Sequence, residues 1–178
     1  MEDPPLRILR LKLTYFLIVM LEVLFQTLPT HTSLYQFYMP DILLVITFVW
    51  IMRRPDVMDP ILITLAFLFA DMILQRPPGI WTLIALCATM FLRSRSMYFK
   101  EIIFFYEWLI IAIVIIFSFT AHHFVLILTF LPTHNLKLLA MQAFLTIMLY
   151  PIFIWVFRSM LRFSLYNTLQ KQTRKAVQ

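Results

Sequence analysis

Three carboxylic acid residues stand inside long apolar stretches of this 178-residue chain and are the first candidates for chemistry: Glu22, Asp71 and Glu107. An ionisable side chain at membrane depth is costly and normally marks an ion or proton pathway or a bonded partner. Two interpretations of Asp71 stay open, namely a proton, ion or partner site and a buried carboxyl bonded to a neighbouring helix or to Arg76. Glu22 and Glu107 also lie within a few turns of an expected helix end, so an interfacial position is a further interpretation for them.

A second group of polar residues is spaced for one face of a helix. Gln142, Thr146 and Tyr150 follow one another at i, i+4 and i+8, and Pro151 comes directly after them. Such a stripe indicates either hydrogen bonds to neighbouring helices or one wall of a substrate cavity, and Pro151 predicts a kink. Under the cavity interpretation, Gln142 joins Glu22 and Glu107 as a candidate ligand contact.

Other residue types exclude several kinds of site. A P-loop, a dinucleotide-binding turn and a nucleophile elbow each need two or more glycines, and this chain has only Gly79. The single cysteine, Cys87, cannot form an internal disulfide or a multi-cysteine metal site. No nucleophile and base can be paired by spacing. We therefore expect no enzymatic activity and no cofactor.

The four histidines do not have the spacing of a metal site. They are His31, His122, His123 and His134. The adjacent pair points in directions about 100 degrees apart on a helix, and no carboxylate accompanies it, so no bound metal is predicted.

The elements that must position these residues are membrane helices. The chain is 62% hydrophobic, only 13% charged and has a mean hydropathy of +0.86, whereas soluble domains have about 25% charged residues. Apolar runs bounded by charge or proline predict one all-α membrane domain over residues 1–178, a bundle of six transmembrane helices. The spans are expected at about 11–28, 34–52, 60–74, 80–92, 102–119 and 138–160, followed by a polar cytoplasmic tail at 167–178.

Some boundaries stay open at this stage. The third and fourth spans are short and closely joined, so they form either full crossings or a hairpin that stops short of the far side. The fifth run continues to Leu131, as one long tilted helix or as a helix with an interfacial piece. Glu22 and the lack of a small-residue cleavage pattern argue against a cleavable signal peptide.

Basic residues predict the orientation of the bundle. With the N-terminus in the cytoplasm, 13 of the 15 Lys and Arg fall on the cytoplasmic side, and only Arg76 and Lys137 fall outside. This bias favours an even number of spans and two cytoplasmic termini. The net charge of +6 is explained by topology and anionic lipid headgroups rather than by nucleic acid.

Three segments carry a resemblance to a known family: Pro40-Asp41-Ile42-Leu43-Leu44, Ala70-Asp71-Met72-Ile73-Leu74, and Arg76-Pro77-Pro78-Gly79-Ile80-Trp81-Thr82-Leu83. With the six-span layout and the basic bias, they resemble MreD, the rod shape-determining membrane protein of bacterial cell elongation. Asp71 and Gly79 match the family's aspartate in the third span and the short turn into the fourth. Ala66 and Ala70 depart from the glycines that many members carry before that aspartate.

The resemblance implies a non-enzymatic subunit of the bacterial inner membrane. Such a subunit partners MreC and, through it, MreB, RodA and the transpeptidase of elongation, and it helps to maintain rod shape during peptidoglycan synthesis. Its fold would be similar to the substrate-binding subunits of energy-coupling-factor transporters. The residues assigned to structure or partner contact are Asp41, Asp71, Arg76, Pro77, Pro78 and Gly79.

An alternative function stays open. A bundle related to a substrate binder can be a transporter subunit that holds a small ligand or a lipid, with Asp71, Glu107 and Gln142 lining its cavity. We expect Asp71→Asn to abolish function while leaving partner recovery intact if Asp71 is a proton or ligand site.

Overall fold

The computed structural model describes residues 4–27, 39–99, 104–132 and 135–176. Within these ranges the chain forms six α-helices and no strand. The helices are α1 (Pro4–Thr27), α2 (Ile42–Arg53), α3 (Pro60–Ile73), α4 (Ile80–Phe99), α5 (Phe104–Leu128) and α6 (Leu136–Ala176). The class predicted from composition, an all-α protein, is confirmed.

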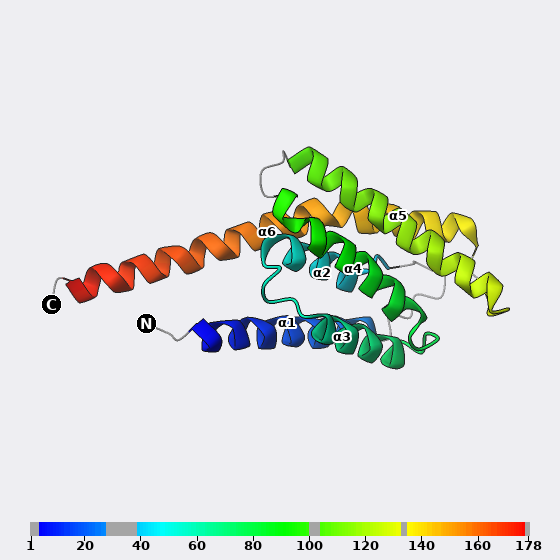
Figure 1. Ribbon diagram of the computed structural model, residues 1–178, viewed down its shortest axis with the longest axis horizontal. Coiled ribbons are helices and arrows are strands. Elements are labelled where there is room, and N and C mark those ends of the chain that lie inside the picture. Colours follow the sequence, from blue (N-terminus) through cyan, green and yellow to red (C-terminus); the bar gives the residue numbers. More distant parts are fainter. Residues whose placement is uncertain (1–3, 28–38, 100–103, 133–134, 177–178) are drawn as a thin grey trace.

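Successive helices run in opposite directions along one axis (Figure 1). One end of the bundle therefore holds the start of α1, the end of α2 and the beginning of α5, and we call it the terminal end because both chain termini lie toward it. The other end holds the connection from α3 to α4, and we call it the hairpin end.

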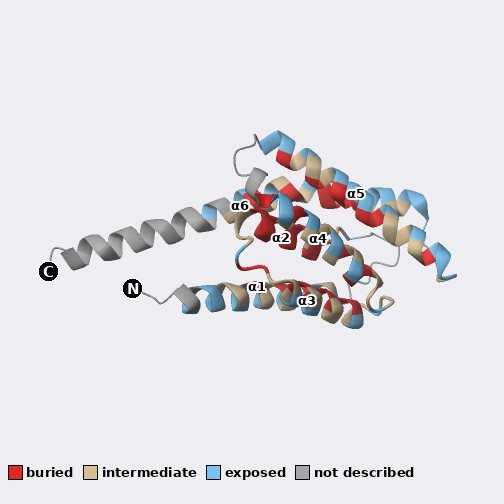
Figure 2. Cartoon of the chain, in the orientation of Figure 1, coloured by how far each residue is buried: buried red, intermediate tan, exposed pale blue. Residues whose placement is uncertain are grey.

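The central element is α2. It packs against α4 and α6, and more lightly against α1. All ten residues from Leu43 to Met52 are buried, and all of them are apolar except Thr47 (Figure 2). The Tyr15 hydroxyl reaches this core from α1 and lies 2.9 Å from the Thr47 hydroxyl.

The helix bounds differ from the expected spans in ways that have local causes. The second helix begins at Ile42 rather than near residue 34, because Asp41 caps its first turn; residues 34–38 lie outside the described ranges. The fourth helix continues past Leu92 to Phe99, since the polar residues that follow are adequate helix formers. The fifth is one helix through Leu128, which decides between the two forms expected for that run.

The sixth helix is much longer than its expected span. It runs through Pro151 without ending, and it extends beyond the other helices at the terminal end (Figure 1). The expected tail at 167–178 is helical up to Ala176.

Helix lengths bear directly on the membrane prediction. Two helices are long and apolar enough to cross a membrane, Phe104–Leu128 with 25 residues and Leu136–Phe157 with 22. The apolar helices α2 and α3 have 12 and 14 residues, or about 18 and 21 Å against a hydrocarbon core of about 30 Å.

The outside of the bundle is apolar along most of its length. Leu17 and Leu21 on α1 are each 67% exposed, and Phe117 on α5 is 72% exposed. Figure 2 shows exposed faces on α1, α4 and α5 opposite their buried faces. A surface of this kind is favourable against lipid and unfavourable against water.

Candidate functional site

Asp41 connects three elements at the hairpin end. Its Oδ1 accepts a hydrogen bond of 2.9 Å from Leu44 N and so caps α2. Its own backbone N–H donates to the Thr146 hydroxyl of α6 over 3.1 Å. Its Oδ2 faces Nη1 of Arg76 at 3.4 Å. A residue that caps a central helix thus also binds the connection between α3 and α4.

Asp71 stabilises the start of α4 from the last turn of α3. Its Oδ2 accepts hydrogen bonds from Gly79 N at 3.2 Å, Thr82 N at 3.2 Å and the Thr82 hydroxyl at 2.7 Å. The carboxyl is fully buried, and Oδ1 has no partner among the residues described. A carboxylate against backbone N–H groups of a first helical turn is favourable, because those donors have no partner within the helix.

The link from α3 to α4 is a tight turn in which two residues have positive φ. Arg76 N donates to Asp71 O over 3.0 Å, and Gln75 between them has φ of 54°, which is the Schellman ending of a helix. Glycine is the usual residue at the position of Gln75. Gly79 has φ of 92°, and a Cβ there would meet no atom within 4 Å, so conformation rather than space favours glycine.

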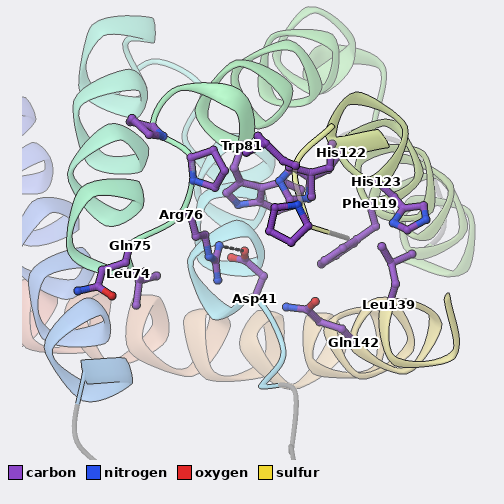
Figure 3. A pocket seen from close by; sticks show the side chains of 15 residues that line it. Asp41, Leu74, Gln75, Arg76, Trp81, Phe119, His122, His123, Leu139 and Gln142 are labelled. Atoms are coloured by element: carbon purple, nitrogen blue, oxygen red, sulfur yellow. Dashed lines mark hydrogen bonds and ion pairs between the residues drawn. The ribbon is translucent and has the colours of Figure 1, made fainter. Parts of the chain in front are cut away.

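These residues surround a cavity of about 820 Å³ at the hairpin end. Figure 3 shows Arg76 and Asp41 on one side of it and Phe119, His123 and Leu139 on the other. Its described lining is Asp41, Leu74, Gln75, Arg76, Pro77, Pro78, Trp81, Phe119, His122, His123, Leu126, Leu131, Pro132, Leu139 and Gln142. The volume is in the range of small-molecule sites, and most of the lining is apolar with a few polar groups.

Most of the residues assigned to partner contact or structure meet at this place. Asp41, Arg76, Pro77 and Pro78 line the cavity, and Asp71 lies directly behind it, where it holds Gly79. Residues from three parts of the sequence are therefore brought together by the hairpin.

Trp81 is a cavity residue that the sequence interpretation did not assign to a site. Its ring lies 5.1 Å from that of Phe119 and 5.0 Å from that of His122, measured between centroids. It is buried, and its indole N–H has no partner within the described part of the chain. The signal available in the sequence was its place two residues after Gly79, in a segment that carries the family resemblance.

The polar stripe on α6 makes bonds to other elements. Gln142 donates to Met39 O over 3.1 Å, Thr146 accepts from Asp41 N, and Tyr150 donates to Glu107 over 2.8 Å. The Tyr150 bond joins α6 to α5, whereas Gln142 and Thr146 bond to the segment that leads into α2. Gln142 also lines the cavity, so the second interpretation applies to it as well.

Glu22 and Glu107 do not line the cavity. Glu22 is buried on α1 and accepts a hydrogen bond from Gln26, while its Oε2 has no partner in the described ranges.

Glu107 lies at the opposite, terminal end. Its two carboxylate oxygens are 3.1 and 3.2 Å from Nη2 of Arg53, and Tyr150 supplies the third contact. This cluster joins α2, α5 and α6 and leaves Glu107 only 3% exposed.

The histidines are divided between described and undescribed parts of the chain. His122 and His123 line the cavity, whereas His31 and His134 lie outside the described residues. Among the residues described, no group of three or more His, Cys, Asp or Glu side chains is placed to hold a metal ion.

Comparison with known proteins yields no relative. No model of a protein family matches the chain, and searches of curated proteins and of solved structures return no match.

Proposed function

We propose that this chain is a non-enzymatic, multi-pass subunit of the bacterial inner membrane that belongs with the cell-elongation complex. In this role it binds an MreC-like partner and, through it, helps to organise MreB, RodA and the elongation transpeptidase. The proposal begins from the resemblance to MreD in the segments around Asp41, Asp71 and Gly79.

The observation that carries the proposal is the convergence of those segments at one end of the bundle. Asp41 contacts Arg76 across 35 positions of sequence, and Asp71 bonds to both Gly79 and Thr82. A docking surface needs side chains held in fixed positions, and these contacts fix the turn from Arg76 to Gly79.

Helix direction and charge support the membrane arrangement. The described helices alternate in direction and direct both termini to the same end (Figure 1). That end also holds Arg53, Arg54, Arg93 and Arg95, which fits a cytoplasmic terminal end and a hairpin end on the far side. The same basic residues are placed for anionic lipid or for a cytoplasmic filament protein.

The test is purification of the tagged, full-length protein from its native membrane in a mild detergent, with mass spectrometry of the retained proteins. We expect an MreC-like protein and elongation enzymes to be recovered. Arg76→Ala and Gly79→Leu alter the hairpin turn and are expected to lower recovery of that partner at least fivefold.

Arg95→Ala is the control because Arg95 is an exposed arginine near the far end of α4, the helix that follows the turn, where it lies over the Phe91 ring. It is expected to leave recovery of the partner unchanged. Wild-type recovery with both hairpin variants, at equal expression, would remove the hairpin end from the interface. Recovery of a pair of ATPase subunits instead would overturn the docking role.

The cavity favours a second candidate function, a membrane subunit that holds a small ligand or a lipid. It is bounded by α4, α5, α6 and the hairpin turn, and Arg76, Asp41 and Gln142 are among its lining residues (Figure 3). A protein purified without partners but with a bound small molecule would favour this function over docking.

A further inference from the structure

The charges that face the cavity are of both signs. Arg76 is the permanently charged cation among the described lining residues, and Asp41 is the anion beside it. Their contact is a single one of 3.4 Å, longer than the 2.7–2.9 Å usual for a charge-assisted hydrogen bond. Each group therefore keeps bonding capacity for an occupant.

Two residues with hydrogen-bond donors and two with acceptors line the cavity. Trp81 contributes an indole N–H that no described residue accepts, on the same helical hairpin as Arg76. Both are donors suited to oxygens of a phosphate. Asp41 Oδ2 and the side-chain oxygen of Gln142 are acceptors suited to an ammonium group.

The surroundings disfavour an occupant that is only anionic. Besides Asp41 in the lining, the buried carboxyl group of Asp71 bonds to Gly79 N and Thr82 N next to the cavity residues Pro78 and Trp81, and one of its oxygens lacks a partner in the described ranges. A purely anionic ligand would bind Arg76 but face these carboxyl groups without a compensating cation. A ligand with its own positive group offsets them.

Most of the remaining lining is apolar. Leu74, Phe119, Leu126, Leu131 and Leu139 form the larger part of this wall with three prolines, and Gln75, His122 and His123 add polar groups to it. Such a surface takes hydrocarbon rather than a hydrated ion. The occupant is therefore an amphiphile with an apolar chain and a head that bears both charges.

We propose that this cavity binds a phospholipid whose headgroup carries a phosphate and a primary ammonium, with the phosphate at Arg76 and Trp81 and the ammonium at Asp41. The inference rests on the second candidate function, the holding of a lipid or small ligand, and is independent of partner docking. It deepens that function by naming the ligand class.

Binding is measured as the rise in Tm of the purified full-length protein in detergent as lipid is added, because a ligand that binds the folded state raises the apparent stability. The probes are dioleoyl phosphatidylethanolamine, dioleoyl phosphatidylglycerol and dioleoyl phosphatidylcholine, which share acyl chains and differ in headgroup. We expect a saturable rise with the ethanolamine lipid at concentrations at least tenfold lower than with the other two.

Three variants locate the effect. Leu139→Trp fills the apolar part of the cavity, and Arg76→Gln removes the phosphate contact; each is expected to weaken the apparent Kd at least tenfold. Lys137→Gln removes an exposed cation of α6 that does not line the cavity; it is the control and is expected to leave the Kd unchanged. If Arg76→Gln does not fold, Leu139→Trp still decides the outcome.

Equal rises with all three lipids would mean general solvation and would overturn the proposal. A stronger effect of the glycerol lipid would show an anionic site instead, and an unchanged Kd in Leu139→Trp would place the lipid elsewhere. Partner recovery from native membranes is a separate readout, so a failed lipid titration leaves the docking role intact, and the reverse also holds.

Discussion

The two ends of the bundle each use an arginine and a carboxylate from different helices, but they use them differently. At the terminal end, Nη2 of Arg53 lies 3.1 and 3.2 Å from the two oxygens of Glu107, and the Tyr150 hydroxyl completes the contacts. At the hairpin end, Arg76 has one contact of 3.4 Å with Asp41 and a side chain that is 31% exposed. Arg53, Glu107 and Tyr150 together connect α2, α5 and α6, whereas the Arg76–Asp41 pair leaves charged groups facing the cavity.

The comparison shows that a buried ion pair does not by itself indicate a functional site. Glu107 and Asp41 have the same exposed fraction, 3%, and each has a partner for both oxygens, but the only contact of Asp41 Oδ2 is the longer one of 3.4 Å with Arg76. Under our proposal, the longer and more exposed pair is the one that binds, and the shorter pair is structural.

The largest expected effect comes from matched changes in the two arginines. Arg53→Gln leaves Glu107 buried without its cation and is expected to lower the free energy of unfolding by about 3 kcal/mol. Arg76→Gln removes a longer, partly exposed contact and is expected to cost about 0.5 kcal/mol. The measurement is thermal unfolding of both variants in the same detergent. Equal losses of stability would contradict the proposed difference between the terminal end and the hairpin end.

An intermediate effect is expected at Asp71. Asp71→Ala removes the acceptor for Gly79 N, Thr82 N and the Thr82 hydroxyl, and the expected loss of stability is about 2 kcal/mol. Asp71→Asn keeps an acceptor oxygen and is expected to lose about 1 kcal/mol or less, with partner recovery unchanged. Should Asn prove as damaging as Ala to stability, or abolish function while the protein stays folded, the negative charge itself would be required, as in a proton or ion site.

The smallest effects concern the two turn residues with positive φ. Gly79→Ala meets no clash but strains the backbone, and its expected cost is about 1 kcal/mol. Gln75→Gly relieves the same kind of strain and is expected to raise stability by about 0.5 kcal/mol. Opposite signs in the two Tm shifts would support the turn geometry, whereas a loss from Gln75→Gly would contradict it.

Sequence patterns predicted the parts of this molecule that depend on short-range order. The apolar runs located six helices, and the resemblance singled out Asp71, Arg76 and Gly79, which lie within nine positions of one another. A capping carboxylate and a turn glycine act over a few residues, so spacing along the chain is enough to find them.

Contacts between distant segments were not predictable in the same way. Nothing in the spacing pairs Asp41 with Arg76 or Glu107 with Arg53, because helix rotation and packing decide which side chains meet. The cavity depends on side chains from three helices, two connections and Asp41 before α2, so Trp81 and Phe119 enter it only once the bundle is formed. Glu107 and Gln142, grouped as one possible cavity by the sequence, lie at different ends for the same reason.

The enclosure of α2 constrains the order in which the protein is assembled during synthesis. This helix is made early, but two of its walls are α4 and α6, and the Asp41–Thr146 bond joins residues 105 positions apart. In a nascent chain whose α6 has not yet been made, one side of α2 is uncovered and the backbone N–H of Asp41 lacks its acceptor. If synthesis stopped before α6 was made, that side would stay exposed, so the burial of α2 depends on the completion of translation.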